Sequence, residues 1–131
     1  MMVAILVIED VEAVRRSLAA ELRRAGHDVT AAANGREGVE CLSRWAFDVV
    51  VVDVWMPEMD GITFLRTVKA SHPRTRFLAV SGGSPMVPLS QTETLAETFG
   101  ADAILYKPVE REPLLAQVDA LIATLPLPRQ P

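Results

Sequence analysis

Unbroken apolar runs occupy three places along the chain, at 3–8, 49–52 and 77–80, and each run ends at polar residues. The second run consists of valines only, which favours an extended backbone. None of the three alternates with polar residues, so both faces of each strand should be covered, as at the centre of a parallel sheet. Weaker strand patterns at 28–32 and 103–106 suit the edges of such a sheet.

Each strand pattern is followed by a helical pattern, in which apolar residues recur at spacings of three and four. Asp10 is expected to cap the first helix, Asn34 to open the second and Asp60 to cap the third. Charged residues of the first helix, Arg15 and Arg16 among them, lie on its other faces. The expected buried positions are Val11, Val14, Leu18 and Leu22; Val39, Leu42 and Trp45; Ile62, Leu65 and Val68; Leu95 and Phe99; and Leu114, Leu115, Val118, Leu121 and Ile122.

Strand followed by helix, five times over, predicts an α/β domain of three layers. Such an order requires a parallel sheet with helices on both faces, joined by right-handed crossovers. Placing the three most apolar strands at the centre gives the sheet order 2-1-3-4-5, with its switch point between the first and third strands.

Length and composition limit the number of domains, the kinds of partner and the location that we expect. The 131 residues suit one domain, which we place at 1–125, ahead of a Pro-rich tail at 126–131. A net charge of -4 and a pI near 5.1 argue against nucleic-acid binding by this chain. Cys41 is the single cysteine, and His27 and His72 are expected at the surface, so no zinc cluster is predicted. The first apolar run is too short for a membrane span and lacks a basic leader; we expect a cytoplasmic protein without membrane contact.

Polar residues follow the ends of four predicted strands. Glu9 and Asp10 follow the first strand and Asp53 the third, while Ser81 and Lys107 follow the fourth and fifth. Because parallel strands lie about 4.8 Å apart and end at one edge of the sheet, the three carboxylates should meet there. Crowded carboxylates repel one another, and a divalent cation offsets that repulsion. Oxygen ligands with open coordination positions suit Mg²⁺.

Phosphoryl transfer is the chemistry that fits this edge. Aspartate is a covalent phosphate carrier, which makes Asp53 the candidate acceptor. Lys107 and the Ser81 hydroxyl are placed to hold phosphoryl oxygens, and Gly82 leaves the approach to Asp53 uncrowded.

Four motifs carry a resemblance to a known family: Glu9-Asp10, the stretch Asp53-Val54-Trp55-Met56-Pro57-Glu58-Met59-Asp60-Gly61, Ser81-Gly82 and Lys107-Pro108. With them the chain resembles, from Val3 to about Leu125, the receiver domain of two-component response regulators (CheY-like). The resemblance implies a flavodoxin-like fold and Mg²⁺-dependent phosphorylation of Asp53 by a histidine kinase or a histidine phosphotransfer protein. It also implies phosphorylation-dependent binding of a downstream protein, with no output domain in this chain.

The resemblance assigns a role to each matching residue. The implied metal ligands are Glu9, Asp10, Asp53 and the backbone carbonyl of Trp55; the implied phosphate-binding and switch residues are Ser81, Gly82 and Lys107; and Pro108 is the candidate for a cis peptide bond.

Two features depart from the family pattern, and two features have more than one possible role. Ile104 stands at the position, three residues before Lys107, where the family usually has an aromatic switch residue. The segment 81–95 is longer than usual and is either a tolerated insertion or a loop that reports phosphorylation to a partner. Trp55, two residues after Asp53, either slows water attack on the acyl phosphate or simply packs.

Two other functions compete with phosphoryl signalling. One is a docking module of the same fold that is never phosphorylated, and the intact set of site residues argues against it. The other is a phosphatase of the haloacid dehalogenase kind, which needs a second acid two residues after its nucleophile. Trp55 holds that position here, so turnover of small phosphate esters is not expected.

Overall fold

Strand and helix alternate five times along the chain, as the apolar pattern predicts. The structure, a computed structural model, describes residues 1–82, 89–98 and 100–126. The strands are β1 (Ala4–Ile8), β2 (Asp28–Ala32), β3 (Val49–Asp53), β4 (Arg76–Ser81) and β5 (Ala103–Tyr106). The helices are α1 (Glu12–Arg24), α2 (Gly35–Arg44), α3 (Gly61–Val68), α4 (Leu89–Thr98) and α5 (Arg111–Ala123), with a 3-10 turn η1 (Lys69–Ser71) after α3.

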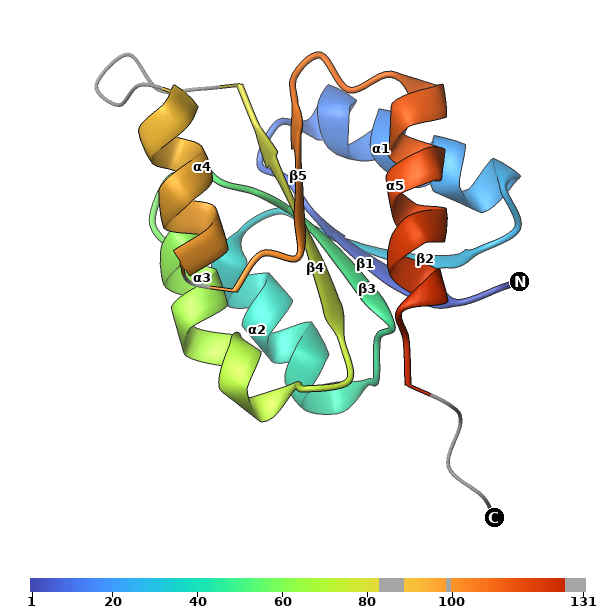
Figure 1. The fold of residues 1–131 in the computed structure, drawn as a ribbon, viewed down its shortest axis with the longest axis horizontal. Helices are drawn as coiled ribbons and strands as arrows, with labels where there is room; N and C mark the ends of the chain where they lie inside the picture. The colour runs from blue at the N-terminus through green and yellow to red at the C-terminus, as the bar shows by residue number, and fades with distance from the viewer. Residues whose placement is uncertain (83–88, 99, 127–131) are drawn as a thin grey trace.

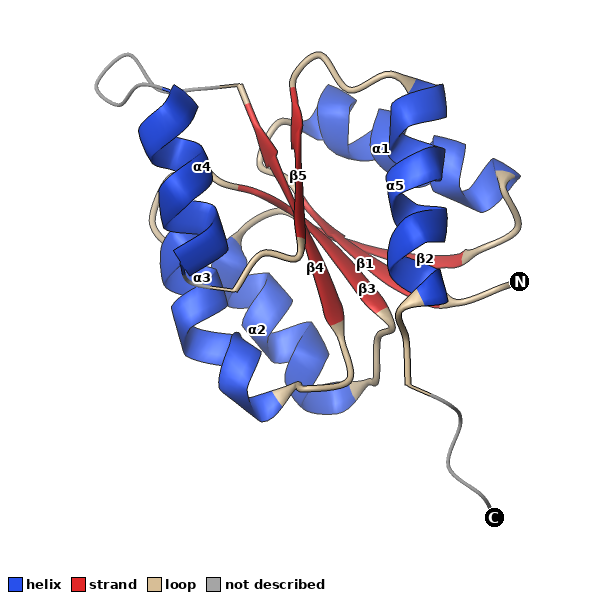
Figure 2. Ribbon diagram, viewed as in Figure 1, coloured by secondary structure: helices blue, strands red, loops and turns tan. Residues whose placement is uncertain are grey.

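The strands pair in parallel in the order β2-β1-β3-β4-β5 (Figure 1). This order is the predicted one, with the most apolar strands at the centre and β2 and β5 at the edges. Helices α1 and α5 lie on one side of the sheet and α2, α3 and α4 on the other (Figure 2). The flavodoxin-like (βα)₅ arrangement in three layers is therefore confirmed.

Successive strand residues face opposite helical layers, because side chains alternate along a strand. One layer packs the inner faces of α1 and α5 onto Ile5, Val7, Val49, Val51, Leu78 and Val80. The other packs α2 and α3 onto Leu6, Ile8, Val50, Val52 and Phe77. Full coverage of both faces explains why the central strands contain no polar alternation.

The same alternation decides which polar residues meet at the carboxyl edge. Glu9 and Asp53 continue the rows of β1 and β3 that face α1 and α5, and Lys107 continues the matching row of β5. Ser81 and Ile104 belong to rows of the opposite face, where Ile104 packs in a separate small cluster beside α4. Glu9, Asp53 and Lys107 thus lie in one layer at this edge, while Ser81 and Ile104 lie in the other.

Two predicted helix starts agree with the structure. Asn34 precedes α2, and its side chain accepts a hydrogen bond from Glu37 N at 2.9 Å. Asp60 precedes α3, and its side chain accepts from Thr63 N at 2.8 Å. Each cap satisfies a backbone N–H that has no partner within its own helix.

Two other helix-end predictions are wrong. Asp10 does not cap α1, because the helix begins one residue later, after Val11, which is 48% exposed and makes no side-chain cap. The carboxylate of Asp10 belongs instead to the acidic cluster described below. Trp45 is not a buried position of α2: the helix has ended there, the backbone is extended, and the side chain is 57% exposed.

The prediction that His27 lies at the surface is also wrong. The residue is 8% exposed, and its ring Nδ1 accepts a hydrogen bond from Val3 N at 3.3 Å. Gly26, with a φ of +95°, lets the chain turn sharply after α1, and this turn carries the imidazole under the start of β1. The second histidine, His72, is half-buried.

Some predictions fall outside the described part of the chain. These are the side chains of Leu95 and Phe99, the middle of the segment 81–95 and the tail from residue 127. Among the described helices, none is both long and apolar enough to cross a membrane.

A close backbone approach at Gly61 fixes the turn that follows β3. Gly61 N donates to Val54 O at 2.7 Å, and a Cβ added to Gly61 would lie 2.5 Å from Asp53 O and 2.8 Å from the Cα of Val54. Both neighbours are backbone atoms and cannot rotate away. The start of α3 therefore lies against the strand end that carries Asp53 only because residue 61 has no side chain.

We expect Gly61→Ala to lower the free energy of unfolding by about 1–3 kcal/mol, the usual range for an overpacked site. Urea denaturation measures the change. Gly82→Ala is the matched control, because its added Cβ would meet Lys107 Cδ at an ordinary 3.4 Å. Equal stability of the two variants would contradict the close approach as the constraint on this turn.

Candidate functional site

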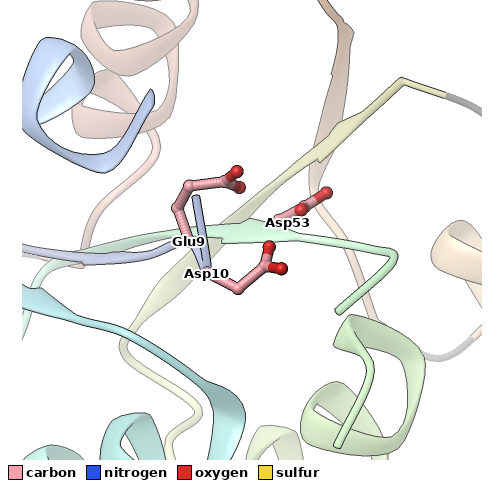
Figure 3. A group of neighbouring side chains, drawn as sticks. All are labelled: Glu9, Asp10 and Asp53. Atoms are coloured by element: carbon pink, nitrogen blue, oxygen red, sulfur yellow. The ribbon is translucent and has the colours of Figure 1, made fainter. Parts of the chain in front are cut away.

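Three carboxylates meet where β1 and β3 end. Glu9 and Asp10 follow β1 directly, Asp53 is the last residue of β3, and one oxygen from each lies within 4.8 Å of the others. Figure 3 shows the three side chains directed toward a common point. Glu9 is 0% exposed and Asp53 4% exposed, so two of these acids have left bulk water. The sequence-based expectation that these acids lie together agrees with this geometry.

Lys107 bridges two of the acids from the far side of β4. Its Nζ lies 2.9 Å from Glu9 Oε1 and 3.2 Å from Asp53 Oδ2. Lys107 N donates to Ser81 O at 2.9 Å, which continues the β4–β5 ladder and fixes where the lysine stem begins. One ammonium thus joins the ends of β1, β3 and β5.

Burial and neighbouring charge shift the titration of this cluster. Desolvation raises the pKa of Asp53 to about 7; the hydrogen bond and charge of Glu9 add to the rise, and Lys107 opposes it. Burial works against the charged form of Lys107, but its hydrogen bond to Glu9 and the charges of Asp53 and Glu9 outweigh burial and raise the pKa of Lys107. Ionising Asp53 in this buried cluster is therefore unfavourable.

The donor set fits a hard divalent cation. Every side-chain donor is a carboxylate oxygen, as Mg²⁺ prefers, and the cluster holds more negative than positive charge when it is ionised. Glu9 Oε2 is buried and finds no hydrogen-bond donor among the described residues. A buried carboxylate oxygen without a partner is costly, and a bound cation would satisfy it.

The remaining predicted site residues surround this cluster. Ser81 is the last residue of β4 and is 0% exposed. Val80, the residue before Ser81, pairs with Asp53 across the β3–β4 ladder. Gly82 follows and is exposed, and the side chain of Lys107 passes beside it. The peptide bond between Lys107 and Pro108 is cis.

Trp55 contacts the site through a backbone hydrogen bond, and its ring packs on the α4 side of the sheet. Its N–H donates to Asp53 Oδ1 at a long 3.4 Å. Its side chain packs in the small cluster that includes Ile104 and Ala96 of α4, and its Nε1 is buried without an acceptor among the described residues. The packing role left open by the sequence is therefore present, while the effect on water attack stays a prediction.

One residue at the site escaped the sequence reasoning. Arg15, assigned only to an outer face of α1, directs its Nη1 to the backbone carbonyls of Glu9 and Asp10, at 2.9 Å and 3.4 Å. Its place one helical turn after the acidic pair is a weak signal, because helical periodicity alone does not distinguish it from Arg16.

Known proteins with the same fold and sequence pattern place the chain in a family. A family model described as the response regulator receiver domain matches residues 5–119. The transcriptional activator protein PfeR of Pseudomonas aeruginosa is 33% identical over 127 residues, covering 97% of this chain and 40% of the relative. The cell cycle transcriptional regulator CtrA of Caulobacter vibrioides is 29% identical over 120 residues, covering 90% of this chain and 49% of the relative. The chain thus spans half or less of the length of these relatives.

Solved structures agree with the sequence comparisons. The chemotaxis protein CheY4 of Vibrio cholerae is 29% identical, with a TM-score of 0.82 over 92% of this chain and 99% of that one. A CheY-like receiver domain protein of Methanospirillum hungatei is 26% identical, with a TM-score of 0.85 over 94% of this chain and 96% of that one. The chain therefore belongs to the response regulator receiver domain family of two-component signalling.

Proposed function

We propose that this chain accepts a phosphoryl group on Asp53 in an Mg²⁺-dependent reaction and signals by binding a protein partner in the phosphorylated form. The phosphoryl donor is a histidine kinase or a histidine phosphotransfer protein, and the setting is the cytoplasm. The observation that carries the proposal is the convergence of three carboxylates and the Lys107 ammonium on one buried edge.

The transfer forms a bond between a carboxylate oxygen of Asp53 and phosphorus. The phosphorus–nitrogen bond of the donor phosphohistidine breaks, and its electron pair returns to the imidazole. Glu9, Asp10, Asp53 and the Trp55 carbonyl are the residues that would hold Mg²⁺, which neutralises charge on phosphoryl oxygens when bound.

One ammonium group and one hydroxyl group of the chain complete the proposed reaction site. Lys107 would exchange its contact with Asp53 Oδ2 for a phosphoryl oxygen, and the Ser81 hydroxyl would donate to another. Asp53 is 4% exposed, so little water reaches its carboxylate, and charged contacts there are stronger than in water.

A cleft beside Lys107 supports approach of the donor from the α1 side. It opens between α1 and the chain that follows β5, and its walls are formed by Ala13, Val14, Ser17, Leu18, Gly82, Lys107, Pro108 and Val109. We place the histidine-bearing partner there.

The phosphatase alternative receives no support from the geometry. The residue two positions after Asp53 is Trp55, whose side chain packs into an apolar cluster instead of presenting an acid. A general acid–base group for repeated hydrolysis is therefore missing from the position where that class of enzyme has it.

Incubation with Mg²⁺ and acetyl phosphate should add one phosphoryl group to the intact protein, measured by mass spectrometry. We expect no addition to Asp53→Asn or in the presence of a chelator. Asp28→Asn is the matched control, because Asp28 is an exposed carboxylate at the opposite edge of the sheet and should not affect labelling. A label that persists in Asp53→Asn would contradict the assignment, and multiple-turnover release of phosphate would favour the phosphatase.

Without metal, stability should fall as the pH rises from about 4 to about 7. The carboxyl of Asp53 has a pKa of about 7 in the fold against an ordinary value of 3.8, so across this range the folded state keeps a proton that the unfolded state has lost. Urea denaturation in the presence of a chelator measures the free energy of unfolding at pH 5 and at pH 8. We expect this free energy to fall more in the wild type than in Asp53→Asn, by at least about 1 kcal/mol, which is near the value of one pKa unit.

Added Mg²⁺ should restore the wild-type stability at pH 8 and leave Asp53→Asn less affected, because the ligand set of the variant has lost a charge. The same pH dependence in both proteins would show that Asp53 is not the group that titrates.

A further inference from the structure

The turn between β1 and α1 carries two acids of the site but lies outside both elements. The ladder of β1 with its neighbouring strands ends at Ile8, apart from Glu9 N, which donates to Ala32 O at 3.1 Å. Helix α1 begins at Glu12, and its cap position, Val11, makes no side-chain hydrogen bond. The carbonyl oxygens of Glu9 and Asp10 therefore need a hydrogen-bond donor from elsewhere in the chain if the turn is to keep one conformation.

Arg15 supplies that partner. Its half-buried guanidinium donates through Nη1 to Glu9 O at 2.9 Å and approaches Asp10 O at 3.4 Å. One group thus holds the backbone of both residues whose carboxylates point at Asp53 (Figure 3). The planar, permanently charged guanidinium is suited to this contact because it presents several donors in a fixed fork.

We propose that Arg15 is a positioning residue for the cation: by fixing the backbone of Glu9 and Asp10 it keeps their carboxylates gathered and so raises the affinity for Mg²⁺. The inference rests on the proposed function. Residues that orient metal ligands without touching the metal commonly change the affinity by one to two orders of magnitude.

Arg15 and Lys107 act differently on the same cluster. Lys107 occupies carboxylate oxygens, Glu9 Oε1 and Asp53 Oδ2, and so competes for atoms that a cation would use. Arg15 bonds to carbonyls and leaves the carboxylate oxygens available.

The chain offers a closely matched control in the next residue of the helix. Arg16 has the same charge and stem, but it is exposed, and its guanidinium lies 3.8 Å from Glu12 on the same helix. A loss of affinity caused by net charge alone would appear equally in Arg15→Ala and Arg16→Ala.

The test is a titration of the full chain with Mg²⁺, followed by tryptophan fluorescence in a Trp45→Phe background. That background leaves Trp55, bonded through its backbone to Asp53, as the reporting indole. We expect Arg15→Ala to weaken Mg²⁺ binding roughly 10-fold, Arg15→Lys to restore part of it, and Arg16→Ala to bind as the background protein does. The Mg²⁺ concentration that half-saturates labelling by acetyl phosphate should rise in parallel, while the rate at saturating Mg²⁺ is largely retained.

Each outcome separates the two proposals. If the background protein itself does not bind Mg²⁺ by fluorescence or calorimetry, the proposed function fails. If it binds and Arg15→Ala binds equally well, the positioning role is overturned and the proposed function stands. A drop in unfolding free energy without a change in Mg²⁺ affinity likewise assigns Arg15 a merely structural role. Should Arg15→Ala not fold, Arg15→Gln, which keeps most of the stem and loses the charge, gives the deciding titration.

Discussion

Mutual repulsion of carboxylates at the carboxyl edge of the sheet is the constraint that the rest of the structure serves. Glu9 and Asp53 lie almost out of contact with water and Asp10 lies beside them, an arrangement that is unfavourable in isolation. The ammonium of Lys107 offsets part of the repulsion by bonding to two of the acids. The remaining carboxylate oxygens fit a divalent cation. Burial, followed by the hydrogen bond and the charge of Glu9, keeps the pKa of Asp53 high.

The sheet holds these groups in place against that repulsion. Asp53 ends a strand of four valines that is covered on both faces, so its backbone is fixed by packing on either side. Gly61 brings the start of α3 against the same strand end, which limits where the following turn can run. The unfavourable electrostatics at the edge are therefore supported by the apolar interior, as is usual for functional sites.

Much of this arrangement was accessible from the sequence. The lengths and apolarity of the strand patterns were enough for the sheet order, and the polar residues at their ends were enough to gather the acids and Lys107. The structure departs from those expectations where a residue's place depends on contacts distant in sequence. His27 is buried because its ring accepts from Val3, and Arg15 joins the site because its guanidinium reaches back to the β1–α1 turn. The predicted helix cap at Asp10 was wrong by one residue, because the periodicity of apolar residues does not define the start of a helix more closely than that.

Division of the edge between two helical layers has a consequence for how such a domain diversifies. Glu9, Asp53 and Lys107 face the α1 and α5 layer, whereas Ile104 and the ring of Trp55 pack on the α4 side. Substitutions of Ile104 or of the ring of Trp55 can accumulate without touching Glu9, Asp53 or Lys107, although Ser81 lies in a row of the same side. An isoleucine at position 104 is therefore compatible with the arrangement of Glu9, Asp53 and Lys107, and the α4 side of the edge can vary independently of these three charged groups.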